Sequence, residues 1–371
     1  MSAKNRLFFA GPLLLLAGIH AACASTWPIE PVDEDHPIGN TMGEFIETIE
    51  GAYQHEGIDV LGDSYDERPD APFVVVTVAG KVESVMMNPD SRDNYVLIMG
   101  ENGDRRYLYA HLEFTTIPIP IILHVNNTPS PAGNTPDENL DREESWPILK
   151  EGAKIAKLSN LFPCEFDHVH YAVQRVNDDA SLTLVNPLLE IRPAPDSSQP
   201  EIAGIHLAQH DGTRWSEIPK NPDSGQCTAV KGEIDIIVEV IDRDDAGSTQ
   251  MGANNVGLHT LRWRACKNMT CSWKDTHTFD EMKPDWTNPN NSETSIHYST
   301  DDPWKSTFDF CAGTPGNRTF MVPTSFAVAG SWKTDDGGVS NGEYELMVQA
   351  KDIAGNKATD SIKVCVSNPV D

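Results

Sequence analysis

Two short segments of the chain combine residue types that bind transition metals. The first is His-Glu-Gly-Ile-Asp at residues 55–59, and the second is His-Val-His at residues 168–170. In an extended chain, residues two apart point to the same face, so His168 and His170 can address one centre. A His-x-His pair arises easily by chance among 12 histidines, so this motif is weak when taken alone.

The spacing of the first segment complements the second. His55 and Asp59 lie four residues apart, and Gly57 between them lets the backbone bend sharply or approach another strand closely. Together the two segments offer imidazole nitrogens and one carboxylate. A catalytic zinc ion takes three such ligands and keeps one position open for water, so we expect the segments to meet in a metal site.

Short strands separated by turns are expected to position these segments. No long helical period appears, and β-branched and aromatic runs alternate with Gly, Asn and Asp. Between two of these strands, residues 115–147 contain six prolines and an acidic cluster, which is typical of a long surface insertion. The strands expected in the N-terminal half are 73–78, 82–86, 95–99, 105–112, 155–158 and 168–176.

The C-terminal half also has a β pattern. Residues 193–200 contain three prolines and predict a semi-rigid linker. Beyond it, the spacing of strands and turns favours an immunoglobulin-like sandwich, and Asp352–Asn356 looks like the last hairpin of bacterial Ig-like modules. The strands expected there are 233–241, 256–263, 343–349 and 361–366.

The order of the motifs in the N-terminal half carries a family resemblance. His-x-Gly-x-Asp is followed by Tyr109-Ala-His111-Leu, then by the turn Lys150–Ile155, then by His-x-His-Tyr-Ala-Val. This order resembles the lysostaphin-like (LytM-type) zinc metallopeptidases, which hydrolyse peptide bonds in bacterial peptidoglycan. The resemblance covers about residues 36–190 and implies an antiparallel β peptidase domain.

The resemblance implies a role for five residues. His55, Asp59 and His170 fill the positions of the family's zinc ligands. His168 and His111 fill those of its catalytic pair, with His168 as general base and His111 helping to stabilise the intermediate. Each position holds the required residue, so a working zinc metalloendopeptidase is favoured, with Zn²⁺ as cofactor.

Three departures from the family concern the substrate groove. Residues 61–72 separate the first motif from the next strand, the 115–147 insertion is added, and residues 158–167 replace a glycine-rich turn. Three functions therefore stay open. These are hydrolysis of peptidoglycan cross-links, hydrolysis of proteins or cationic peptides, and a non-catalytic zinc scaffold that recruits or activates a partner hydrolase.

Charge and the N-terminus constrain the compartment and the partners. Asp and Glu outnumber Lys and Arg by 56 to 28, a net charge of −28, which argues against nucleic acid and anionic lipid as partners. Lys4 and Arg6 precede an apolar run, Leu7–Ile19, that is too short to span a bilayer. This layout predicts a signal peptide over residues 1–24 and export to the periplasm, cell surface or medium.

Seven cysteines are consistent with an oxidising compartment. Cys23 is removed with the signal peptide or, as the second-ranked alternative, carries a lipid. The other six favour disulfides over a zinc ribbon, and Cys266 and Cys271 are close enough in sequence for a local bridge. The spacing does not fix the remaining connectivity, and Cys164 is either free or bridges the two domains.

Other candidate residues are weaker. Asp242–Asp245 and Asp352–Asn356 could suit calcium, but an acidic connecting turn is the preferred interpretation. His36 and His124 are expected in solvated loops.

The expected organisation is therefore a mainly β chain of two domains. The C-terminal sandwich would contact the wall or a protein partner, or cover the groove. The expected segments are a signal peptide at 1–24, a zinc metallopeptidase domain at 25–192, a linker at 193–200 and an Ig-like region at 201–371.

Overall fold

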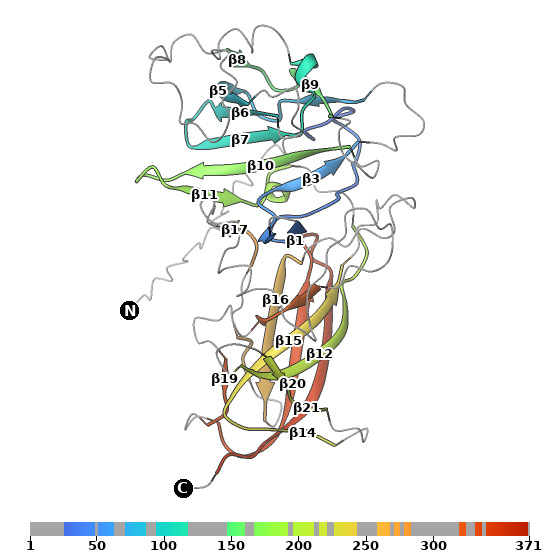
Figure 1. Cartoon of the computed structure of the whole chain (residues 1–371), viewed down its shortest axis with the longest axis vertical. Helices are drawn as coiled ribbons and strands as arrows, with labels where there is room; N and C mark the ends of the chain where they lie inside the picture. The colour runs from blue at the N-terminus through green and yellow to red at the C-terminus, as the bar shows by residue number, and fades with distance from the viewer. Residues whose placement is uncertain are drawn as a thin grey trace, which may run out of the picture.

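The computed structural model describes fifteen stretches of the chain. Within them the regular structure is almost entirely β, with short 3₁₀ turns at Phe114–Thr116 and Pro187–Leu189, which confirms the mainly β prediction (Figure 1). No helix among them is long and apolar enough to cross a membrane. The described residues are 26–48, 51–62, 71–86, 94–117, 147–159, 167–191, 196–210, 215–220, 226–242, 258–267, 271–274, 278–282, 319–323, 331–335 and 339–369.

Several predicted features lie outside the described residues. They include the signal segment 1–24 and nearly all of the 115–147 insertion. The others are the first part of the 193–200 linker, most of the segments 61–72 and 158–167, and Cys164, Cys311 and His124.

The N-terminal region is organised around one antiparallel sheet of eight described strands, in the order β17-β11-β10-β7-β6-β5-β8 with β3 beside β10. Two small antiparallel pairs, β1 with β2 and β4 with β9, flank it. The strands are β1 (Phe45–Thr48), β2 (Gly51–Gln54), β3 (Ile58–Leu61), β4 (Phe73–Val75), β5 (Gly80–Met86), β6 (Tyr95–Gly100), β7 (Arg105–Ala110), β8 (Ile148–Leu149), β9 (Lys154–Lys157), β10 (His168–Val176), β11 (Leu182–Val185) and β17 (Glu281–Met282).

Strand β10 is the centre of this sheet. Its residues 170–175 pair with β7 along one edge. On the other edge its first residues, 168–171, pair with β3, and its last residues, 173–176, pair with β11. The start of β10 therefore lies between β3 and the end of β7.

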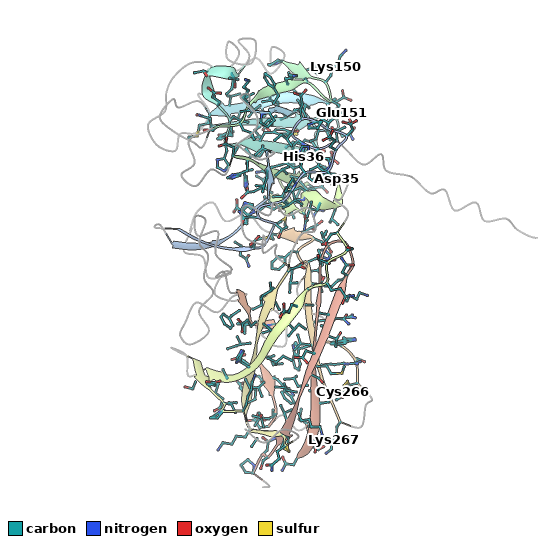
Figure 2. The ribbon with its side chains drawn as sticks, turned by 90° about the vertical axis from the view of Figure 1, so that its right-hand side faces the viewer. Asp35, His36, Lys150, Glu151, Cys266 and Lys267 are labelled. Atoms are coloured by element: carbon teal, nitrogen blue, oxygen red, sulfur yellow. A yellow bond between two sulfur atoms is a disulfide. The ribbon has the colours of Figure 1, made fainter. Side chains whose placement is uncertain are left out.

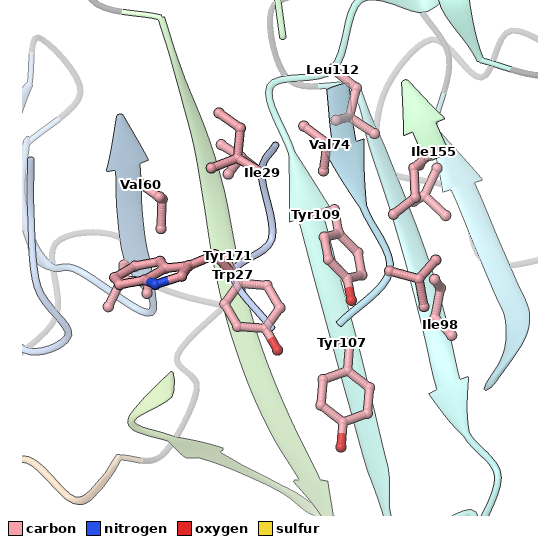
Figure 3. Close-up of a cluster of buried hydrophobic side chains, with 14 of the residues drawn as sticks. Trp27, Ile29, Val60, Val74, Ile98, Tyr107, Tyr109, Leu112, Ile155 and Tyr171 are labelled. Atoms are coloured by element: carbon pink, nitrogen blue, oxygen red, sulfur yellow. The ribbon is translucent and has the colours of Figure 1, made fainter. Parts of the chain in front are cut away.

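Alternation along β10 divides its side chains between two faces. Val169, Tyr171 and Val173 belong to the buried cluster of the N-terminal region. Figure 3 shows Tyr171 in this cluster beside Tyr109 of β7. The intervening positions, including His168 and His170, face the opposite side of the sheet. The apolar face thus holds the strand in place while the other face carries the histidines.

A buried hydroxyl network crosses the same core. The amide N–H of Thr77 donates to the Tyr109 hydroxyl oxygen at 2.9 Å, and the Thr77 hydroxyl lies 2.8 Å from that of Tyr109 and 2.9 Å from that of Tyr171. Burial raises the pKa of both tyrosines, so both hydroxyls keep their protons at neutral pH. The network ties residue 77 to the two strands that carry the histidines.

The expected strand 73–78 is shorter than predicted. Pairing with β9 ends at Val75 with a register shift, and Thr77 turns its amide toward Tyr109 instead of a neighbouring strand. At Thr77, a hydrogen bond to a side chain therefore takes the place of the backbone hydrogen bond that a longer strand would make.

The C-terminal region is a sandwich of two sheets that enclose one buried cluster. One sheet has the order β13-β12-β15-β18, with β19 also on β15, and the other has the order β14-β21-β20-β16. Strands β14 and β21 pair in parallel, and the immunoglobulin-like connectivity stays a prediction. The strands are β12 (Glu201–His210), β13 (Trp215–Glu217), β14 (Thr228–Val230), β15 (Glu233–Ile241), β16 (Thr260–Cys266), β18 (Thr319–Met321), β19 (Trp332–Lys333), β20 (Gly342–Lys351) and β21 (Lys357–Val366).

Two disulfides join described residues of this region. Cys227 is bonded to Cys365, next to the parallel strand pair, and Cys266 is bonded to Cys271 as a local bridge. The expected Cys266–Cys271 bridge is therefore confirmed. Figure 2 shows Cys266 in the C-terminal region, far from His36 in the N-terminal region.

The hydroxyl network leads to a stability prediction. Tyr109→Phe leaves the buried Thr77 amide without an acceptor, so we expect the free energy of unfolding to fall by about 1–3 kcal/mol in urea titrations. Tyr344→Phe is the control, because its hydroxyl donates to the backbone carbonyl of exposed Ser340, which water can reach. An equal decrease in the free energy of unfolding in the two variants would contradict a stabilising role for the hydroxyl network.

Candidate metal centre

The register between β3 and β10 brings the two motifs together. Asp59 is paired directly with His170, and Leu61 with His168. Directly paired residues of antiparallel strands project to the same face, so the carboxylate of Asp59 and the imidazole of His170 meet. On the other edge of β10, His170 is paired with Ala110, and His111 follows immediately.

Three donor atoms form a small triangle on this face. His55 Nε2 lies 2.9 Å from His170 Nδ1, His170 Nδ1 lies 3.0 Å from Asp59 Oδ1, and Asp59 Oδ1 lies 3.1 Å from His55 Nε2. In the described part of the chain, these three residues form the one group able to hold a metal ion. Tetrahedral zinc with bonds of 2.0–2.2 Å keeps its ligand atoms roughly 3.3 Å apart, so the donor set fits zinc with small adjustments.

Hydrogen bonds from outside the triangle orient two of its ligands. Nδ1 of His55 lies 3.3 Å from the carbonyl oxygen of Thr41, which can only accept, so Nδ1 carries the proton and Nε2 presents its lone pair. The side-chain amide of Asn40 donates to Asp59 Oδ2 at 2.7 Å, which leaves Oδ1 for a metal. Such partners fix the tautomer and direction of metal ligands.

The electrostatics of the triangle favour an ionised carboxylate. Burial alone raises the pKa of Asp59, but His55 and His168 together with hydrogen bonds bring this pKa well below its ordinary value. Burial lowers the pKa of His55, yet attraction to Asp59 outweighs burial and this pKa is raised. Burial and the charges of neighbouring histidines lower the pKa of His170, which favours the neutral, metal-binding form.

His168 and His111 lie beside the triangle. Their ring centroids are 4.7 Å apart with the rings nearly perpendicular, and His111 is 6.0 Å from the ring of His170. His168 is 2% exposed, and its Nε2 lies 3.7 Å from Asp59 Oδ2. The structure thus brings the five predicted site residues into one cluster, with three donors in contact and two histidines alongside.

The backbone at His111 is unusual. Its φ of 65° lies in the left-handed region, which non-glycine residues enter at a cost, and its carbonyl accepts from the amide of Ser159. Strained backbone of this kind is found where the surrounding structure fixes a functional side chain.

Gly57 has a steric role between the first two ligands. A Cβ placed on Gly57 would lie 2.5 Å from the carbonyl oxygen of Tyr171 and 3.1 Å from the Cβ of Ala172. The chain between His55 and Asp59 therefore passes directly against β10, as the glycine in the motif predicted.

The orienting residues Asn40 and Thr41 were missed by sequence reasoning. They lie within residues 25–50, a polar segment without periodicity that is called the lead-in here, and only the fold brings them to the ligands. The prediction for His36 was wrong. It is 1% exposed, next to Trp27, and its Nε2 donates to the Pro31 carbonyl, because the lead-in packs into the core.

Comparisons with known proteins give distant structural similarities. No protein-family model and no curated protein sequence matches the chain. The structure of LytU is 18% identical with a TM-score of 0.26, covering 42% of this chain and 83% of that one. The solution structure of lysostaphin is 13% identical with a TM-score of 0.24, covering 57% and 85%.

A third similarity is to dimeric latent PorU from Porphyromonas gingivalis. It is 10% identical with a TM-score of 0.22, covering 78% of this chain and 24% of that one. Scores at this level assign neither fold nor function, so the function has to be inferred from the geometry of the site.

Close packing at Gly57 leads to a prediction on metal affinity. We expect Gly57→Ala to push the His55–Asp59 segment away from β10 and to weaken zinc binding about tenfold or more in a chelator competition assay. Gly62→Ala is the control, because a Cβ there meets the flexible end of Leu158 at 3.0 Å. Unchanged affinity in Gly57→Ala would contradict the steric argument.

Asp167, just before His168, leads to a prediction on pH. Burial raises its pKa from 3.8 to about 6, so the folded state binds this proton more tightly than the unfolded chain. Its contribution to stability is full below about pH 4 and is lost as the pH rises through 6. In urea titrations of metal-free protein, the free energy of unfolding of Asp167→Asn should therefore rise relative to that of the wild type between pH 4 and 6. Above pH 7 the difference between the two free energies should be constant.

Proposed function

We propose that this chain is an exported zinc endopeptidase that hydrolyses peptide bonds in peptidoglycan cross-links. One observation carries the peptidase proposal: two imidazole nitrogens and one carboxylate oxygen converge within 3.1 Å, with two further histidines beside them. Three protein ligands and one open position are the arrangement of catalytic zinc.

The residues around the centre divide the chemistry. A zinc ion held by His55, Asp59 and His170 would supply Lewis acidity, which would polarise the scissile carbonyl and lower the pKa of water at the open position to about 7. His168 accepts the proton of the attacking water as general base and returns it to the leaving amine. His111 donates a hydrogen bond to the oxygen that gains negative charge. The side chain of His170 is 16% exposed, more than those of His55 and Asp59, so solvent reaches the centre at this ligand.

The substrate proposal rests on the order of motifs in the sequence. This order resembles peptidases that act on peptidoglycan, and a signal peptide would deliver the chain to that polymer. The altered residues around the groove favour one alternative, a protein or cationic peptide substrate, because an acidic surface attracts positive charge.

Separate variants distinguish metal binding from catalysis. We expect His170→Ala to lose zinc and activity together. His168→Ala should keep its zinc and lose about 100- to 10,000-fold in rate, as expected for a missing general base. His206→Ala, on β12 of the C-terminal region, should change neither. Zinc content is measured by atomic absorption, and activity by the release of peptides from purified sacculi.

The released fragments decide the substrate. New amine and carboxyl ends in peptide cross-links, detected by mass spectrometry and absent with His168→Ala, are the expected result. Cleavage of cationic peptides with intact sacculi would replace the substrate proposal. Zinc-loaded protein inactive on both substrates would contradict the enzyme proposal and favour a scaffold.

A further inference from the structure

A short segment of the C-terminal region reaches the N-terminal sheet. This segment, residues 278–282, is called the docking arm below. It is fixed to the sandwich at β16, where Thr278 bridges to Thr260 and the Phe279 amide donates to the His259 carbonyl at 2.9 Å. The imidazole of His259 lies 2.7 Å from Asp280 Oδ1. The arm is therefore an extension of the sandwich.

The other edge of the arm completes the N-terminal sheet. Strand β17 pairs with β11, matching Met282 with Leu184, so the arm is the outermost strand beyond β11 (Figure 1). Both the backbone and the side-chain amides of Asn186 donate to arm carbonyls at 2.8 Å. Arg175 of β10 forms a two-pronged ion pair with Glu281.

Phe279 of the arm lies against the loop that orients the metal ligands. Its side chain is 1% exposed, and a Cβ at Gly43 would overlap its ring. Gly43 has a φ of +85°, so this position needs glycine for both its backbone and its contact. Met42 belongs to the same buried cluster of the C-terminal region as Phe279.

The same loop holds His55 by its backbone. The amide of Gly43 donates to the His55 carbonyl at 2.8 Å, and the His55 amide donates to the Glu44 carbonyl at 2.8 Å. The Thr41 carbonyl takes the Nδ1 proton of the imidazole. Contact therefore runs without interruption from Phe279 through Gly43 to the ligand His55.

We propose that Phe279 is a positioning residue for the metal centre, so that the C-terminal sandwich forms part of the site's support. Because the Phe279 ring packs against Gly43, the arm keeps the loop 41–44 in the position that directs His55 Nε2 at the metal. Loss of the ring leaves a cavity under Gly43, and the loop and His55 gain freedom. This inference rests on the proposed zinc site for its functional consequence.

The first test compares zinc affinity in two full-length variants. We expect Phe279→Ala to weaken zinc binding about tenfold or more. Phe320→Ala is the matched control, since Phe320 is also a buried phenylalanine of the sandwich, 2% exposed, and belongs to a separate small cluster. Phe320→Ala should leave zinc affinity within about twofold at a similar loss of stability. Equal effects, or no effect in either variant, would overturn the proposal.

The second test needs no metal. In zinc-free protein, hydrogen exchange at the Gly43 and His55 amides should be at least tenfold faster in Phe279→Ala, and unchanged in Phe320→Ala. Unchanged exchange in Phe279→Ala would overturn the positioning role. If the wild type fails to bind zinc, the proposed function is contradicted. The exchange rates still show whether Phe279 holds Gly43 and His55 in position.

A conservative variant separates positioning from unfolding. Phe279→Leu keeps much of the buried volume and should fold even where Phe279→Ala does not. We expect intermediate zinc affinity and intermediate exchange at His55, with Phe320→Leu unchanged in both. Wild-type values for Phe279→Leu, together with a Phe279→Ala chain that is simply unfolded, would overturn the proposal.

Discussion

The antiparallel pairing of β3 with β10 places Asp59 opposite His170, and the site depends on this register. A slip of one residue would turn either side chain to the other face of the sheet and separate the carboxylate from the imidazole. The register is specified from the opposite face, where Val169 and Tyr171 are fully buried in the core. Packing on one side of the sheet thereby fixes the chemistry on the other.

Around this pair, the remaining contacts limit the freedom of each ligand. The loop 39–44 hydrogen-bonds to both His55 and Asp59, and it lies between the N-terminal sheet and the C-terminal sandwich. A site held from both sides keeps its donors in place without a metal, which lowers the ordering cost when an ion binds. The cost of this arrangement is that the two regions cannot be separated freely.

The sequence alone predicted the β class, most strands and the five residues that cluster at the site. Residues two apart on one strand share a face in any fold, which was enough to pair His168 with His170, and the resemblance of the motif order supplied His55, Asp59 and His111. It did not predict the support by Asn40, Thr41 and Phe279. The segment that carries Phe279 is held by pairings such as Leu184 with Met282, which join residues far apart in the chain. Its strand β17 has only two residues, so it leaves no periodic signal in the sequence. The buried His36 was missed for the same reason.

X-ray absorption at the zinc edge tests the central claim most directly, because it reports the identity and distance of the donor atoms around bound zinc. The account predicts one zinc ion per chain with four nitrogen or oxygen neighbours at about 2.0–2.2 Å, an imidazole pattern from two histidines and no sulfur. A sulfur shell near 2.3 Å would place the metal on cysteines instead. That result, or a shell of water oxygens without imidazole, would contradict the assignment of His55, Asp59 and His170 as the metal site.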